Sequence, residues 1–392
     1  MIAPPKRKSL GLGVVLTALL LLTGCLANDV RYLASDELNG RNNNTAGSIK
    51  AQDMILGYLE QWTEGADPTR EGRDAYKDYS FFGGTSLIGV LPGTDLADEY
   101  VMVGAHYDGL GNACEGAGAE DSICNGATDN ATGVAVALNI LRSFAFSGTS
   151  PRRSIIFAFW DREEDNLGGS RHYKLFPLIP LEDTVAYVNL DIQGANLRPS
   201  GANSTFAVGA ETGGPMLVDA VAAAAAPGVL DTWQLSLIFG QGRSDHANLI
   251  DGGVPSVFFT DSTGPCYHSV HDEVDVVDFD KLEAQYQTAQ RLVADLVDRD
   301  DRPTLATGLP LATYEDAVVV ATLFDRLLAD LALLTPPQQT AFLGHLATVQ
   351  GIVAAGPAAF DDAAMLAMLQ ATAPVVNDIV TSGPCDGFLD AP

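Results

Sequence analysis

Short runs of apolar and β-branched residues recur through the first three quarters of the chain, each with the length of a buried strand. These runs cover residues 86–91, 100–105, 154–160, 184–190 and 256–260. Apolar residues at helical spacing mark a second set of segments, which covers residues 46–62, 130–144, 169–176, 215–225 and 279–297. Because strands alternate with helices, the pattern predicts an α/β three-layer sandwich, with helices on both sides of a mixed, largely parallel central sheet.

The pattern changes after a polar stretch at residues 298–303, which we interpret as a domain boundary. Beyond it alanine and leucine dominate, and helical spacing returns near residues 313–334, 338–355 and 360–381. We therefore expect a main domain over residues 25–300 and an α-helical C-terminal extension over residues 301–392. We expect the extension to be a packing or docking module, and residues 26–44 to form a short tether and the start of the fold.

The N-terminus has the composition of an export signal. Basic residues at positions 6–8 precede an apolar run at residues 10–22, which is too short for a membrane-spanning helix. The ending Leu-Thr-Gly-Cys, with Cys25 last, resembles a bacterial lipobox. That resemblance implies cleavage after residue 24 and a lipid anchor on Cys25, in an exported bacterial lipoprotein of the outer membrane or cell surface. The alternative is an ordinary signal peptide with a chance cysteine.

Composition and charge narrow the classes of partner. Hydrophobic residues make up 47% of the 392 residues, which excludes disorder as a description of the whole chain. There are 50 acidic and 22 basic residues, with a formal net charge of −28. An acidic surface repels phosphate backbones, so we expect no nucleic-acid partner.

Four further cysteines, Cys114, Cys124, Cys266 and Cys385, remain after Cys25. An even number in an exported chain predicts two disulfides, for which three pairings are possible. One of these pairings would close a short loop between Cys114 and Cys124 and tie the C-terminal tail to Cys266. A cysteine-ligated zinc site is disfavoured, because the sequence contains no Cys-x-x-Cys pair.

Residues of metal-binding type follow several of the predicted strands. They are His106, Asp108, Asp129, Glu163, Glu164, Asp191 and His268. Each alone has an ordinary explanation, as a surface turn, a solvated loop or a helix N-cap. In an open α/β sheet, however, ligands bind beyond the carboxyl ends of the strands, so side chains scattered along the sequence can converge there. We therefore predict that these residues form one site.

The ordered motifs resemble those of the co-catalytic dizinc aminopeptidases, a family that also contains glutamate carboxypeptidase II and the glutaminyl cyclases. The matching stretches include ASDELNGR, VGAHYDGLG, NGATDNATGVAVAL, FAFWDREEDNLGGSRHY, YVNLDIQG, SDHANLIDGGVPSVFF and CYHSVHDEVD. The resemblance covers about residues 30–297 and leaves out the helical extension. It implies a zinc exopeptidase catalytic domain that holds two Zn²⁺ ions.

The resemblance also implies a set of metal ligands. Asp129 would bridge the two ions, His106 and Asp191 would complete one zinc site, and Glu164 and His268 would complete the other. Imidazole nitrogens and carboxylate oxygens suit Zn²⁺, which keeps an open position when it is catalytic.

Three further residues receive catalytic roles from the same resemblance. Glu163 matches the general base that takes a proton from the attacking water and passes it to the leaving amine. Asp108 would orient the imidazole of His106. Tyr267 stands where some members carry a tyrosine that stabilises the oxyanion.

We expect the remaining candidates to be structural. His172 and His246 are predicted to pack, and His268 fits the ligand position better than His271. The acidic residues that follow His271 are expected to be loop charges: Asp272, Glu273 and Asp275.

The resemblance therefore implies a metal-dependent exopeptidase, and we expect an aminopeptidase that acts on peptides. A carboxypeptidase-like relative would use the same hydrolytic core. A glutaminyl cyclase would need a single zinc ion, which the complete second ligand set disfavours. A non-catalytic binding module on a peptidase scaffold would have lost ligands, and none is lost here.

Overall fold

The computed structural model describes residues 25–119, 121–381 and 385 of the 392-residue chain. Within these residues nine strands form one sheet in the order β1-β3-β5-β4-β6-β9-β7-β8, and β2 pairs with β3. The strands are β1 (Glu64–Gly65), β2 (Lys77–Tyr79), β3 (Thr85–Leu91), β4 (Leu96–His106), β5 (Arg153–Trp160), β6 (Thr184–Leu190), β7 (Ser204–Val208), β8 (Asp231–Leu235) and β9 (Ser256–Thr260). The central strands β5, β4, β6 and β9 are parallel, while β3 and β7 pair antiparallel to β5 and β9. The expected mixed sheet is confirmed.

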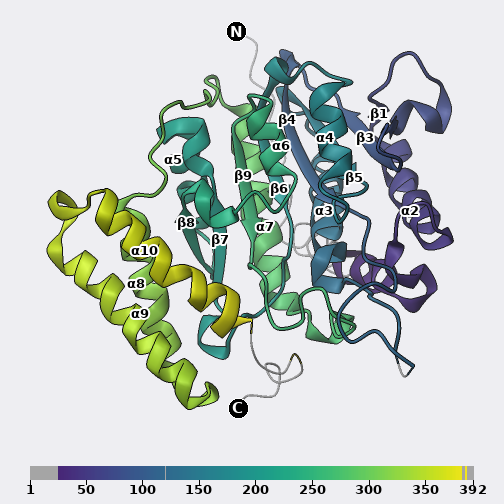
Figure 1. The fold of residues 1–392 in the computed structure, drawn as a ribbon. Helices are drawn as coiled ribbons and strands as arrows, with labels where there is room; N and C mark the ends of the chain where they lie inside the picture. Colours follow the sequence, from purple (N-terminus) through teal and green to yellow (C-terminus); the bar gives the residue numbers. More distant parts are fainter. Residues whose placement is uncertain (1–24, 120, 382–384, 386–392) are drawn as a thin grey trace, which may run out of the picture.

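Helices cover both faces of this sheet (Figure 1). They are α2 (Ala46–Trp62), α3 (Thr132–Phe146), α4 (Gly168–Leu175), α5 (Gly214–Ala225), α6 (His246–Asp251) and α7 (Phe279–Asp298). Helices α2, α3, α5 and α7 pack on one face, and α4 and α6 pack on the other. The three-layer α/β architecture predicted from the alternating pattern is therefore confirmed.

Strand β5 shows why the apolar runs form the centre of the sheet. All of its eight residues are buried. Phe157 and Phe159 point into the layer of α3 and α7, whereas Ile156 and Trp160 point into the layer of α4 and α6. A strand that is covered on both faces needs apolar side chains at consecutive positions, and this is the pattern in the sequence.

The helical extension packs over one end of the sheet (Figure 1). It consists of α8 (Tyr314–Leu327), η9 (Leu328–Leu333), α9 (Pro336–Ala355), α10 (Asp362–Pro374) and η11 (Val375–Val380). Val208, Leu235 and Phe258 from β7, β8 and β9 share a buried cluster with Val320 and Phe324 of α8. The stretch Asp362–Val380 has the length and apolar composition of a membrane span, but part of it packs in this cluster.

The start of the described chain corrects one expectation. Residues 25–33 form a helix, and Leu26, Val30 and Leu33 are buried in the main core. The expected tether at the start of residues 26–44 is therefore wrong, because the apolar spacing of these residues buries one helix face in the body. The predicted signal peptide, residues 1–24, lies outside the described residues.

Two disulfides are present, as the even number of cysteines predicted. Cys114 is bonded to Cys124, and Cys266 is bonded to Cys385. The first closes a loop between β4 and α3. The second joins the C-terminal tail to the loop that follows β9, directly before Tyr267.

Candidate active site

The parallel strands at the centre of the sheet end at one edge, and this edge collects the predicted polar residues. His106 is the last residue of β4, and Asp191 follows β6 directly. Glu163 and Glu164 lie in the loop after β5. Because β4 is parallel to both β5 and β6, these three strand ends lie next to one another.

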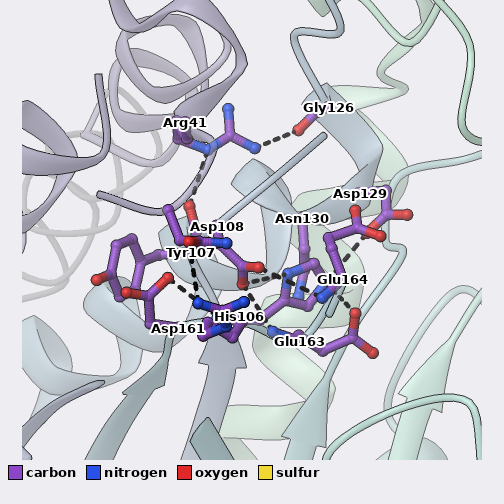
Figure 2. Close-up of polar contacts among 12 residues, drawn as sticks. Arg41, His106, Tyr107, Asp108, Gly126, Asp129, Asn130, Asp161, Glu163 and Glu164 are labelled. Atoms are coloured by element: carbon purple, nitrogen blue, oxygen red, sulfur yellow. Dashed lines mark hydrogen bonds and ion pairs between the residues drawn. The ribbon is translucent and has the colours of Figure 1, made fainter. Parts of the chain in front are cut away.

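Two groups of donor atoms share one carboxylate. The Nε2 atom of His106 lies 3.1 Å from Oδ1 of Asp129 and 3.3 Å from Oδ1 of Asp191. The Nε2 atom of His268 lies 3.2 Å from Oδ2 of Asp129 and 3.0 Å from Oε2 of Glu164. In each group the three donor atoms lie within 4.8 Å of one another. Asp129 therefore presents one oxygen to each group, and Figure 2 shows it beside Glu164.

Buried charge at this edge is dominated by carboxylates. Burial raises the pKa of Glu163 well above its usual value, and the carboxylate of Asp191 adds to this rise. Burial acts to lower the pKa of His106, but Glu163 and Asp191 outweigh it and hold this pKa well above normal. Burial likewise raises the pKa of Glu164, to about 7. Crowded carboxylates of this kind, next to two imidazoles, are the donors that Zn²⁺ binds in proteins, so the residues fit such an ion.

Asp108 lies behind the donor groups and is fully buried. Its two carboxylate oxygens accept hydrogen bonds from the backbone N–H groups of Glu163 and Glu164, at 3.1 and 3.3 Å. Its Oδ1 also lies 3.5 Å from Nδ1 of His106, an ion-pair distance that is longer than a normal hydrogen bond (Figure 2). The carboxylate thus holds the loop that carries both glutamates.

Glu163 and Tyr267 border the open side of the site. Oε2 of Glu163 lies 3.9 Å from Nε2 of His106, and both Glu163 and Tyr267 line the same cavity as Asp129. The ring of Tyr267 stacks on His268 with 3.8 Å between ring centroids. Burial raises the pKa of Tyr267 well above its usual value, so its hydroxyl keeps its proton and can donate a hydrogen bond.

Asp272 is not the solvated loop charge that we expected. It is buried, and one oxygen accepts from both the backbone N–H and the hydroxyl of Thr128, at 2.8 and 2.7 Å. The other oxygen accepts from the backbone N–H of Asp129 at 3.0 Å. The expectation was wrong because this acid caps the segment that carries Asp129. Asp275, by contrast, is exposed, and Glu273 is half-buried and accepts from Asn125.

Arg41 is a second buried residue that sequence reasoning missed. Its guanidinium donates to four backbone carbonyls, those of Leu33, Tyr107, Asn125 and Gly126. Figure 2 shows the contacts with Tyr107 and Gly126. These contacts join the N-terminal helix to the loop after His106 and to the segment before Asp129. Its burial lowers the pKa of Arg41, which the nearby carboxylates of the site partly offset.

The other histidines lie outside both donor groups. His172 is half-buried and pairs with Asp78, with 3.3 Å between Nε2 and Oδ1. His246 is fully buried and stacks on Phe258. His271 is exposed.

Comparison with known proteins identifies the family of this chain. Residues 86–293, slightly more than half of the chain, match peptidase family M28. The chain belongs to peptidase family M28. Membership in this family of peptidases confirms the resemblance to the zinc exopeptidases, and the helical extension lies beyond the matched residues.

Individual relatives of this M28 member either match a shorter part of the chain or have a lower sequence identity to it. Mouse aminopeptidase NAALADL1 is 38% identical over 125 residues, which are 30% of this chain and 15% of that protein. The chain spans less than a fifth of the curated relatives that it matches. The LapA aminopeptidase of Legionella pneumophila has a TM-score of 0.57 at 19% identity, over 77% of this chain and 80% of that one. A glutaminyl cyclase of Bacteroides thetaiotaomicron has a TM-score of 0.55 at 19% identity, over 70% and 97%. These two structures show the same fold.

Proposed function

We propose that this M28 member is a dizinc aminopeptidase, which hydrolyses the peptide bond after an N-terminal residue. One observation carries the proposal: Asp129 presents one carboxylate oxygen to each of two donor groups, and Glu163 lies beside them. Family membership supports the coarser statement, a metal-dependent exopeptidase.

The residues that would hold the two ions are those of the two donor groups. His106 and Asp191 belong to one group, Glu164 and His268 belong to the other, and Asp129 belongs to both. Zinc, when bound, lowers the pKa of a coordinated water and polarises the substrate carbonyl.

The neighbouring residues would transfer the proton and stabilise the negative charge that develops on the substrate. Glu163 takes a proton from the attacking water while the oxygen of that water adds to the carbonyl carbon. Glu163 then passes this proton to the amine when the carbon–nitrogen bond breaks. Asp108 keeps Glu163 in place through the backbone N–H groups that it binds. Tyr267 donates its hydroxyl proton in a hydrogen bond to the developing oxyanion.

Replacement of the proposed base tests this function. In Glu163→Gln, hydrolysis of aminoacyl p-nitroanilides should fall about 10²- to 10⁴-fold, while zinc content stays near that of the parent, because the base is removed and no ligand is. Asp165→Asn, an exposed change on the same loop, should leave both unchanged. Hydrolysis by Glu163→Gln at the parent rate would refute the mechanism. Equal cleavage of N-blocked and free peptides would refute the aminopeptidase specificity.

The proposal also includes export and a lipid anchor on Cys25, in the outer membrane or on the cell surface of a bacterium. Cys25 is not part of either disulfide, and two disulfides suit an oxidising compartment. Cys25→Ala should move the protein from the membrane fraction to the soluble fraction. Unchanged fractionation would show that the chain is held in another way or not at all.

A further inference from the structure

A cavity of about 390 Å³ begins at the site and continues under the helical extension. Asp129, Glu163 and Asp191 line one end of it. Its volume lies in the range of sites that enclose drug-sized ligands, about 300–1,000 Å³. For comparison, an engineered apolar cavity of about 150 Å³ holds a benzene ring. The space therefore exceeds what a single leucine side chain fills.

Apolar side chains from two parts of the chain face each other across this cavity. The sheet contributes a floor of Phe206, Val208, Leu235 and Phe258. The extension contributes a roof of Val320, Leu323, Phe324, Leu369, Val375 and Val376, from α8, α10 and η11. Among the described lining residues, the three site carboxylates are the only acidic ones. Three arginines, Arg198, Arg243 and Arg326, and several hydroxyl and amide side chains also line the cavity. Between the floor and the roof, however, the facing side chains are apolar, so this part of the cavity suits an apolar ligand group.

A buried pair of hydrogen bonds and a partly exposed ion pair hold the roof on the sheet. Asp316 of α8 accepts hydrogen bonds from the backbone N–H and the hydroxyl of Ser236, at 2.8 and 2.6 Å. Arg326 of α8 pairs with Asp231 of β8 at 2.7 Å. The disulfide from Cys266 adds a covalent tie to the tail beyond η11. These contacts make the cavity a fixed part of the fold.

We propose that α8, α10 and η11 roof a pocket for a large apolar group on the acyl side of the hydrolysed bond. This inference rests on the proposed function, because the occupant is identified by the continuity of the cavity with Glu163 and Asp191. The roof lies outside the residues matched to the family, whereas the floor lies within them, so the extension supplies one side of the pocket. The preferred N-terminal residue is accordingly longer and more apolar than leucine.

A series of substrates with increasing chain length tests the pocket. The probes are p-nitroanilides of 2-aminoalkanoic acids with three, six, eight, ten and twelve carbons. Burial of one methylene contributes at most about a threefold to fourfold gain. We expect kcat/KM to rise at least tenfold between six and ten carbons.

Two variants fill the pocket from the roof. Leu323→Trp on α8 and Val376→Trp on η11 should remove most of the gain for long chains and leave the three-carbon substrate within about twofold of the parent. Val318→Trp is the matched control on α8, because this side chain is 39% exposed and does not line the cavity. It should retain the full gain.

The outcomes separate the pocket from the proposed function. If the three-carbon substrate is cleaved but kcat/KM does not rise beyond six carbons, the pocket is refuted and the function stands. If no substrate is cleaved, the proposed function fails, and calorimetry with 2-amino-1-alkanols of six to twelve carbons decides the pocket. Affinity that rises with chain length in the parent but not in Leu323→Trp supports it, and affinity that is flat in both refutes it.

Discussion

The two ends of the cavity are built in opposite ways. At the polar end, Asp129, Glu163 and Asp191 come from three separate segments. Two of these segments are fixed by backbone N–H groups that donate hydrogen bonds to the carboxylates of Asp108 and Asp272. At the other end, helices present ordinary apolar side chains over the sheet. The polar end depends on single atoms at short distances, whereas the apolar end depends on volume. Substitutions should therefore act sharply at the first and in proportion to size at the second.

The largest effect should follow a change at the shared carboxylate. Asp129→Asn removes an anionic oxygen from both donor groups, so zinc should be lost from both and hydrolysis should fall more than about 100-fold, since even residues behind metal ligands contribute about 10- to 100-fold. Metal analysis measures the zinc content, and kcat/KM across the chain-length series measures hydrolysis. The value of kcat/KM should fall by the same factor for short and long substrates. Asp275→Asn, an exposed change in the loop of His268, is the control. Full zinc content in Asp129→Asn would contradict the shared role.

A smaller effect should come from His246, which lies under the apolar end and stacks on Phe258. Burial lowers the pKa of His246 to about 3, whereas an unfolded chain has a histidine pKa of about 6.5. Below pH 6.5 the unfolded state therefore binds up to one more proton than the folded state. The free energy of unfolding falls accordingly as the pH decreases from 6.5 toward 3.

His246→Leu should remove that pH dependence. Between pH 6 and 4 the free energy of unfolding of the parent should fall, relative to the variant, by up to about 1.4 kcal/mol per pH unit. Urea unfolding of both proteins at several pH values measures the difference, in which the other titrating groups cancel. A difference that is constant across this range would show that His246 titrates alike in both states.

Much of the fold could be predicted because burial on both faces leaves a clear pattern. Strands β4, β5 and β6 are apolar at nearly every central position. Strands β7 and β8 were missed, because they are short and mix polar residues, such as Thr205 and Gln234, with apolar ones. On one face their burial comes from the extension packed over Val208 and Leu235, which local pattern does not reveal.

The site could be predicted only as far as residue type carries the signal. Histidine and carboxylates after strands are recognisable, whereas Arg41 and Asp272 look like surface charges. Their importance comes from distant backbone groups, since Arg41 binds carbonyls at four positions between Leu33 and Gly126. The roof has no signal either, because Leu323 and Val376 occur in helical stretches that resemble any packing helix.

The buried helix at residues 25–33 has a consequence for how the molecule would sit in its surroundings. Leu26 is already part of the core, so no slack separates position 25 from the folded body. An attachment at Cys25 would therefore connect directly to the folded body, without a flexible linker between them. The body would then lie directly next to the surface that holds it, because no linker separates position 25 from the core.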